Sequence, residues 1–261
     1  MRFFKDTKKY FPYAVYSAKA ELKSEVANSY LNWIWWVLEP ICTMLVYMLV
    51  FGNILPNMKE DYFGAFLFVG LTVWGFFNKN LVNSVKLVVN NKSIISKVYL
   101  PKTILILSKI MVNGFKMLIN LGIVVILMIY YKVPVTIHVL EVFPLLVLLT
   151  VITYALMGIL LHLGVFVEDM AYVISILLKL VYFLTGIFYN IDTKVKDDTL
   201  RYVLGVGNPI GYVIREMRLV ILGGQGIDWT LYFIWLGIGL VCCFAVNRVI
   251  YKNENSYIKS I

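Results

Sequence analysis

Long apolar runs alternate with short polar segments along the whole of this chain. A helix needs about 20 mostly apolar residues to cross the hydrocarbon core of a bilayer. The runs that meet this length are residues 31–51, 63–82, 104–131, 139–167, 171–189 and 229–246. The pattern predicts an all-α integral membrane protein in which residues 1–261 form one transmembrane domain with six spans.

The residues before the first span predict a helix of a different kind. From Pro12 to Val26, apolar residues recur at the spacing of one helical face, and charged residues occupy the other positions of the wheel. This pattern is typical of an amphipathic helix that lies on a membrane surface. We expect residues 1–29 to form a cytoplasmic interface helix region, with an ordinary charged lead-in to the first span as the alternative.

A second non-spanning segment, residues 190–228, comes before the last span. It is too long for a turn and too interrupted for a span, because Gly205, Gly207 and Pro209 break it. Helical spacing returns over residues 210–222. Short re-entrant helices on the extracellular side, which satisfy their own backbone groups within the outer leaflet, would produce this pattern. The alternative is an interfacial extracellular loop.

Composition removes several classes of protein. Hydrophobic residues make up 61% of the chain and charged residues 15%, against roughly 45–50% and about 25% in a soluble domain. The net charge of +9 does not predict nucleic-acid binding, because the basic residues lie between apolar runs and form no continuous groove. With the N-terminus inside, the inner segments hold 13 Lys and Arg and the outer segments 7. Both termini are therefore expected to be cytoplasmic.

Polar side chains within the spans are the most informative positions. In the third span Lys109, Asn113, Lys116 and Asn120 share one helical face. The same spacing recurs at Lys79, Asn83, Lys86 and Asn90. A lysine near the bilayer centre costs about 2.5–3.5 kcal/mol, so these faces should meet protein or water. Our hypothesis is a cytoplasmic vestibule that holds an anionic substrate such as a lipid diphosphate. Snorkelling lysines with interhelical Asn hydrogen bonds are the alternative.

Other candidates for the lining of a path are acidic or aromatic. Glu39 is the only acid deep within a span and precedes Pro40, so we expect it to be buried with a partner or protonated, in transport or in helix packing. Aromatic rings could anchor the helices at the interface or stack on sugar faces. The candidates for the translocation path are Trp35, Glu39, Trp74, Phe77, Lys109, Asn113, Lys116, Asn120 and Lys179.

Signs of bound cofactors are missing from the sequence. There is no G-x-x-x-x-G-K-[ST] run to hold nucleotide phosphates. The three cysteines lie in apolar segments, and neither His138 nor His162 has a carboxylate at ligand spacing. No nucleophile is paired with a base. We expect no enzymatic activity, no metal and no cofactor in this chain, so any ATP and Mg²⁺ would bind a separate partner subunit.

Several motifs, in order along the chain, carry a resemblance. Residues 29–40 read S-x-L-N-x-x-W followed by E-P, residues 70–77 read G-L-x-x-W-x-F-F, and residues 95–102 read I-x-K-V-Y-x-P-K. The single positions that match are Asp169, Asn208, Pro209 and Arg218. Together they resemble the membrane permease of ABC-2 type exporters of polysaccharides, O-antigens and teichoic acids. Thr185-Gly186-Ile187 stands where that family has S-P-I.

The resemblance implies a homodimer of this chain in the bacterial cytoplasmic membrane, with two nucleotide-binding ATPase subunits docked beneath it. The interface helix and the cytoplasmic coupling loop 83–103 would receive the motion of the ATPases. The candidates for this coupling are Lys19, Lys23, Lys92, Lys97, Tyr99, Pro101 and Lys102. The candidates in the outer re-entrant region are Asn208, Pro209, Arg215 and Arg218.

The implied cargo is an undecaprenyl-diphosphate-linked glycan or a teichoic-acid polymer, moved across a membrane whose lipid surrounds the subunit. Two other classes stay open. An ABC-2 exporter of a small amphiphile, a drug or a peptide, would show a greasy lateral pocket. A membrane-embedded glycosyl- or phosphotransferase would need clustered acids, and the chain offers only the acids Glu168, Asp169, Asp192, Asp197 and Asp198.

Overall fold

The computed structural model describes residues 2–27, 30–54, 61–167 and 169–259. Ser29 and Glu168, which the sequence patterns above include, lie outside the described residues. All regular elements within the described ranges are helical, so the all-α prediction is confirmed.

Five helical segments are long and apolar enough to cross a bilayer: Asn32–Gly52, Phe63–Val85, Lys102–Tyr130, Ile137–Phe166 and Trp229–Lys252. Their elements are η1 (Asn32–Ile34), α2 (Trp35–Tyr47) and η2 (Met48–Ile54) for the first, α3 (Phe63–Val85), α6 (Lys102–Tyr130), η4 (Ile137–Glu141) with α7 (Val142–Phe166), and α12 (Trp229–Lys252). These five correspond to five of the six predicted spans.

The helix predicted over residues 171–189 is shorter than expected. Helix α8 (Met170–Leu184) has 15 residues, which is about 22 Å at 1.5 Å per residue. It ends before Gly186, whose φ of +71° is left-handed and easily adopted by glycine alone. The sixth apolar helix therefore exists but falls short of a full span.

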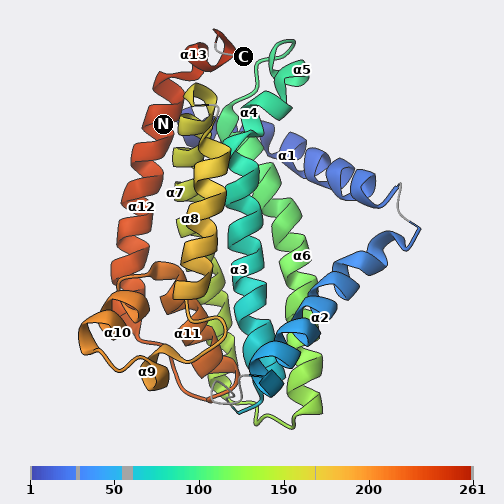
Figure 1. Cartoon of the computed structure of the whole chain (residues 1–261). Coiled ribbons are helices and arrows are strands. Elements are labelled where there is room, and N and C mark those ends of the chain that lie inside the picture. The colour runs from blue at the N-terminus through green and yellow to red at the C-terminus, as the bar shows by residue number, and fades with distance from the viewer. Residues whose placement is uncertain (1, 28–29, 55–60, 168, 260–261) are drawn as a thin grey trace.

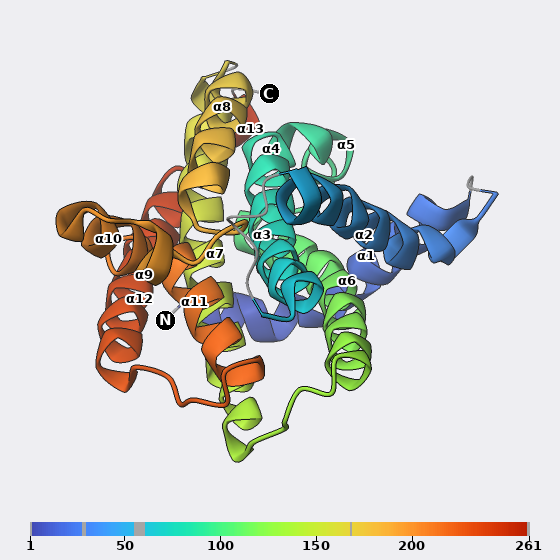
Figure 2. The same ribbon diagram turned by 60° about the horizontal axis from the view of Figure 1, so that its bottom comes forward.

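Helices α3 and α7 form the centre of the bundle. Of the most apolar window of α3, 72% is buried, and 17 of the 23 residues of this helix are buried. Such burial places α3 in the core of the bundle. Helices α6, α11 (Pro209–Ile221) and α12 pack against this central pair, as Figures 1 and 2 show.

The first helix differs from its predicted start. Helix α1 spans Arg2–Ala27 and runs straight through Pro12, so the expectation that Pro12 opens the helix is wrong. Proline inside a helix leaves one carbonyl without its hydrogen bond. Pro12 lies on the exposed side of α1, where solvent can satisfy that carbonyl. The buried side includes Ala14 and Ala18, close to the predicted apolar face.

Helices α1 and α2 together form an arm that stands away from the bundle. Helix α1 lies across one end of the bundle, and α2 returns from its far tip at an angle (Figure 1). Only 6% of the apolar window that contains α2 is buried. We call α1 and α2 the arm, and α3 and α6 the body, because the site lies between them.

The two ends of the bundle carry different elements (Figure 1). Helices α4 (Leu87–Asn90), α5 (Lys92–Ile95) and α13 (Glu254–Lys259) lie at the end that α1 crosses, which we call the terminal end. Helices α9 (Ile191–Lys194), α10 (Asp198–Gly205) and α11 lie at the opposite, distal end. The predicted short helices between residues 190 and 228 are thus present.

Local sequence explains where these distal helices begin. Each starts after an Asn or Asp whose side chain accepts a hydrogen bond from a backbone N–H of the first turn, and this satisfies an otherwise orphaned donor. The capping residues are Asn190, Asp197, Asn208 and, for α12, Asp228. Pro209 follows one of these caps at the position where proline is pre-organised for a helix.

Candidate functional site

A polar cleft lies between the arm and the body. Its volume is about 410 Å³, and it contains four charged side chains, four asparagines and two tryptophans. Its lining is Glu25, Val26, Asn32, Trp35, Trp36, Glu39, Pro40, Lys79, Asn83, Asn113, Lys116 and Asn120. Residues from α1, η1, α2, α3 and α6 thus surround one charged space.

The lysines of the body face carboxylates of the arm. Lys116 Nζ lies 2.5 Å from Glu25 Oε2, and Lys109 Nζ lies 2.5 Å from Glu21 Oε1, about one turn away on α1 and two turns away on α6. A third pair, Lys79 Nζ to Glu39 Oε1, is looser at 3.5 Å. Pairing compensates the desolvation of a buried ammonium group, which explains how α6 carries two lysines on one face.

An amide pair fixes α3 against α6 at the floor of the cleft. Asn113 Nδ2 donates to Asn80 Oδ1 at 2.9 Å, and Asn80 Nδ2 donates to the Phe76 carbonyl at 2.8 Å. Both asparagines are buried. This part of the lysine and asparagine stripe therefore makes the interhelical hydrogen bonds that we considered as its alternative interpretation.

A second cavity extends the cleft along α3. Its volume is about 210 Å³, and it shares Glu39, Pro40, Lys79 and Asn120 with the polar cleft. It reaches Trp74 and Tyr182. Charged and amide groups therefore give way to aromatic groups along one continuous lining.

An aromatic cluster continues from this point between α2, α3 and the segment after α8. The Trp74 and Tyr182 rings lie 5.3 Å apart, and the Tyr182 and Phe188 rings 5.1 Å apart. Phe188 stacks on Phe51 at 4.3 Å and contacts Tyr47 at 4.9 Å. Such ring pairs each contribute about 0.5–1.5 kcal/mol beyond their buried area.

The structure brings most of the predicted path residues together. Those that line the polar cleft or the second cavity are Trp35, Glu39, Trp74, Asn113, Lys116 and Asn120. Phe77 is buried with its ring 5.6 Å from that of Trp74. Lys109 pairs with Glu21 outside the cleft lining, and Lys179 lies exposed on α8. Their roles in transport stay predictions.

The structure contradicts the predicted burial of Glu39. Its side chain is 61% exposed in the single chain, so the expectation of a buried carboxyl is wrong, although the expected partner is present in Lys79. The reason is that α2 packs loosely against the bundle, so the cleft that Glu39 lines is open.

The sequence did not single out Glu21 and Glu25 as site residues. The signal was present, since they lie one helical turn apart on α1 and match in number the two lysines of the α6 face.

The predicted coupling residues occupy two environments at the terminal end. Lys19, Lys23, Lys92 and Lys97 are exposed. Pro101 and Lys102 are buried at the start of α6, with Lys102 only 1% exposed. The hydroxyl of the exposed Tyr99 donates to Glu254 Oε2 of α13 at 3.1 Å. The four exposed lysines are thus the candidates that a docked protein could contact.

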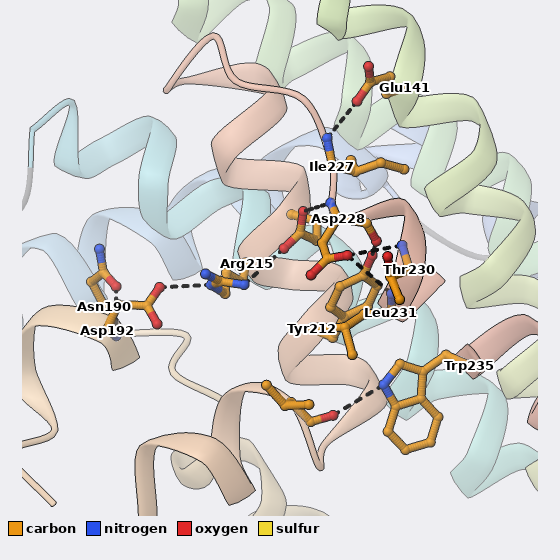
Figure 3. Close-up of polar contacts among 12 residues, drawn as sticks. Glu141, Asn190, Asp192, Tyr212, Arg215, Ile227, Asp228, Thr230, Leu231 and Trp235 are labelled. Carbon is orange, nitrogen blue, oxygen red and sulfur yellow. Dashed lines mark hydrogen bonds and ion pairs between the residues drawn. The ribbon is translucent and has the colours of Figure 1, made fainter. Parts of the chain in front are cut away.

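A distal polar network joins α9, α11 and the start of α12 (Figure 3). Arg215 Nε donates to Asp192 Oδ2 at 2.7 Å, and its Nη1 to Glu216 Oε1 at 3.1 Å. Glu216 Oε2 accepts the Asp228 backbone N–H at 3.0 Å, and Glu141 Oε2 accepts that of Ile227 at 2.7 Å. The predicted outer residue Arg215 therefore links α9 to α11, and Glu216 links α11 to the start of α12.

Arg218, another predicted outer residue, is buried one turn further along α11. Its guanidinium donates to the carbonyls of Phe66, Gly186 and Ile187 at 3.1, 2.8 and 2.7 Å, and it lies 3.5 Å from the centre of the Phe66 ring. Arg218 thus ties α3 to the backbone that follows α8.

The distal network predicts a pH dependence of stability. Burial raises the pKa of Glu216, an effect that the Asp228 N–H and Arg215 partly oppose. A carboxyl whose pKa is higher in the folded state than in the unfolded state stabilises the fold at pH values below the unfolded pKa of 4.5. This contribution is lost as the pH rises through the folded-state pKa. Glu216→Gln should therefore flatten the fall in thermal stability above pH 4.5 in detergent, measured by intrinsic fluorescence. Asp198→Asn, at an exposed carboxyl, should leave the profile as in the wild type, and parallel profiles for Glu216→Gln and the wild type would contradict the prediction.

Comparison with known proteins agrees with the fold and with the motifs. A family model described as ABC-2 type transporter matches residues 15–222. An O-antigen export system permease protein RfbA of Myxococcus xanthus is 26% identical over 242 residues, 92% of each chain. Two proteins of that name from Klebsiella pneumoniae are 24% identical over 93% of each chain and 23% identical over 82% of each chain. The family model covers most of the chain, which confirms the resemblance drawn from the motifs: the chain belongs to the ABC-2 type transporter family.

Proposed function

We propose that this chain is the permease subunit of an ATP-driven exporter that moves a lipid-linked polysaccharide or teichoic-acid polymer across the bacterial cytoplasmic membrane. The observation that carries the proposal is the polar cleft and its continuation into the aromatic cluster, in a chain similar over most of its length to permeases named for O-antigen export. Charged and amide side chains suit a hydrated, anionic cargo. A small amphiphile would be better served by an apolar pocket such as the one of about 260 Å³ between α7 and α12, which shares no residue with the polar cleft.

The proposed path runs from the polar cleft to the aromatic cluster. The lysines of the cleft would meet the phosphate-bearing end of the cargo, and the asparagines would hydrogen-bond hydroxyl groups. Trp74 and Tyr182 line the second cavity, where sugar rings could stack on them, and the buried Phe188 supports Tyr182 from behind. Such stacking does not demand one sugar identity, as a polymer exporter requires.

Exposed charged groups within the apolar bundle support a homodimer. Glu39 and Lys79 are half-exposed or more in the single chain, and Lys179 of α8 is exposed. A charged side chain facing lipid costs about 2.5–3.5 kcal/mol at the bilayer centre. A second copy of the chain, with a water-filled passage between the copies, would remove this cost and cover the bare face of α2.

Energy would come from two separate nucleotide-binding ATPase subunits, which hold the ATP and Mg²⁺. The exposed lysines at the terminal end, Lys19 and Lys23 on α1 and Lys92 and Lys97 in the loop, form the surface proposed to receive them. The excess of Lys and Arg on the segments at this end favours its cytoplasmic placement, with both termini inside.

Complementation tests the function. Cells that lack this chain, with the partner ATPase left in place, should lose surface polymer, accumulate its lipid-linked precursor inside and recover both when the chain is restored. The ATPase should also copurify with the tagged chain. Normal surface polymer in cells without the chain, or loss of drug efflux in place of polymer export, would overturn the proposal.

Lys116→Met is expected to lower polymer export at least tenfold. The substitution removes a cation from the cleft and leaves Glu25 without its 2.5 Å partner. Surface polymer measured at equal expression is the readout, and Lys132→Met, at an exposed lysine between α6 and η4, should export normally. Unchanged export by fully expressed Lys116→Met would remove this lysine from the path.

A further inference from the structure

The ion pairs between the arm and the body all run in the same direction. Among the described residues, three ion pairs join the two parts: Lys109 with Glu21, Lys116 with Glu25 and Lys79 with Glu39. In every pair the carboxylate belongs to the arm and the ammonium group to the body. One displacement of the arm would therefore separate all three pairs together.

The two helices of the arm differ in how deeply they are buried. Helix α1 keeps Ala14 and Ala18 buried, whereas α2 is hardly buried at all. The pairs follow the same gradient, because those of Glu21 and Glu25 are short and partly shielded while that of Glu39 is long and open. Near the polar cleft, these ion pairs hold the arm to the body together with one ring contact, between Trp36 and Phe115, whose centroids lie 5.8 Å apart.

Separation of these pairs has an electrostatic consequence. The closed cleft holds Glu25, Glu39, Lys79 and Lys116, so its formal charges cancel. Without the arm, the body side would present lysines alone. Uncompensated ammonium groups in a partly desolvated site are costly, so a stable open state needs another anion in place of the carboxylates.

We propose that Glu25 and Glu39 are internal counter-anions, and that a phosphate-bearing group of the cargo takes their place on Lys116 and Lys79 when the arm swings away. Glu21 and Lys109 hold the adjacent turn of α1 in register for this exchange. A diphosphate carries enough charge to compensate both lysines at once, and a neutral glycan does not. The nature of the cargo rests on the proposed function. The exchange itself rests on the three pairs.

The proposed exchange and a purely structural role for the pairs predict different effects of glutamate removal on anion binding. If the glutamates compete with the ligand, removing one of them strengthens anion binding. If the pairs only hold the arm in place, removing a glutamate weakens the fold and leaves anion binding unchanged or weaker. Binding to the isolated permease therefore distinguishes the two without any transport measurement.

The probes are farnesyl diphosphate, inorganic diphosphate and farnesol, titrated into the full chain in nanodiscs of neutral lipid. Trp35 and Trp36 line the cleft, so tryptophan fluorescence reports binding, with thermophoresis as an independent readout.

Glu25→Gln should lower the Kd for farnesyl diphosphate about 5- to 10-fold, and Lys116→Gln should raise it at least tenfold. Lys132→Gln, which changes charge at an exposed lysine outside the cleft, should bind as the wild type, and farnesol should not respond to any of these variants. If inorganic diphosphate binds as well as farnesyl diphosphate, the site recognises the phosphate groups alone. If inorganic diphosphate binds more weakly, the site recognises a lipid headgroup.

The double exchange E25K/K116E separates stability from binding. It keeps the ion pair with its direction reversed, so thermal unfolding should stay close to that of the wild type while diphosphate binding is lost. Wild-type binding by the double variant, or a Kd for Glu25→Gln that does not fall, would overturn the proposal. Those results leave the proposed function standing, because polymer export in complemented cells tests that separately.

Discussion

Replacing Arg218 with alanine is expected to lower the free energy of unfolding by about 3–5 kcal/mol, the largest loss we predict for a single residue. The guanidinium satisfies three backbone carbonyls, those of Phe66, Gly186 and Ile187. Alanine would leave these buried acceptors unpaired and remove the cation from the Phe66 ring. Loss of the link between α11, α3 and the segment after α8 should also loosen the distal network. Thermal and denaturant unfolding in detergent would measure the change.

Two variants serve as controls for this expectation. Arg218→Lys should recover only part of the loss, because a single ammonium group cannot address three carbonyls with the planar geometry of a guanidinium. Arg201→Ala removes an arginine of the same end that donates only to the Val195 carbonyl and pairs with the exposed Asp198, so it should cost less than about 1 kcal/mol. An Arg218→Ala protein as stable as Arg201→Ala would contradict the assignment.

Arg218 also explains why glycine occupies the first position of the G-L-x-x-W motif. A Cβ atom on Gly70 would lie 2.6 Å from Arg218 Nη2, so the glycine that opens the G-L-x-x-W stretch leaves room for the guanidinium. The motif located both residues from the sequence. Their contact could not be read there, because 148 positions separate them and only the packing of α11 on α3 brings them together.

Local patterns predicted the elements of this fold well where the physics is local. Apolar runs located the spans, since bilayer thickness sets their length. Helical spacing over residues 210–222, after the break at Gly205, Gly207 and Pro209, located α11. Helix α1 begins before the stretch whose pattern predicted it, because Pro12 lies on the exposed side of the helix, where proline is tolerated. Exposure is a property of the assembled protein and cannot be read from the local pattern.

The candidate site was predictable only on one of its two sides. The stripe containing Lys109 and Lys116 identified a helix face that needed partners, because the cost of a lysine in the membrane is a local property. The identity of the partners depended on how α1 crosses α6, with Glu21 and Lys109 distant in sequence. The open position of Glu39 likewise follows from the loose packing of α2, which hydrophobicity alone does not encode.

Gly164→Ala is expected to separate the two central helices and to cost about 3 kcal/mol. A methyl group at this position of α7 would overlap the Val85 carbonyl oxygen and lie 2.8 Å from its carbon. These are backbone atoms at the end of α3, so no side-chain rotation can relieve the overlap. Helix α3 leads directly into the loop that carries Lys92 and Lys97, so a shift of its end should reduce polymer export as well as thermal stability.

Gly122→Ala is the matched test for this close approach. It makes the same change within the transmembrane helix α6, but an added Cβ there meets nothing within 4 Å. Alanine is the better helix former by about 0.5–1 kcal/mol, so this variant should be as stable as the wild type or slightly more stable, with normal export. If both glycine variants behaved alike, the loss could not be assigned to the contact between Gly164 and Val85. A stable, fully active Gly164→Ala protein would mean that α3 and α7 can move apart at the terminal end without disturbing the loop between α3 and α6.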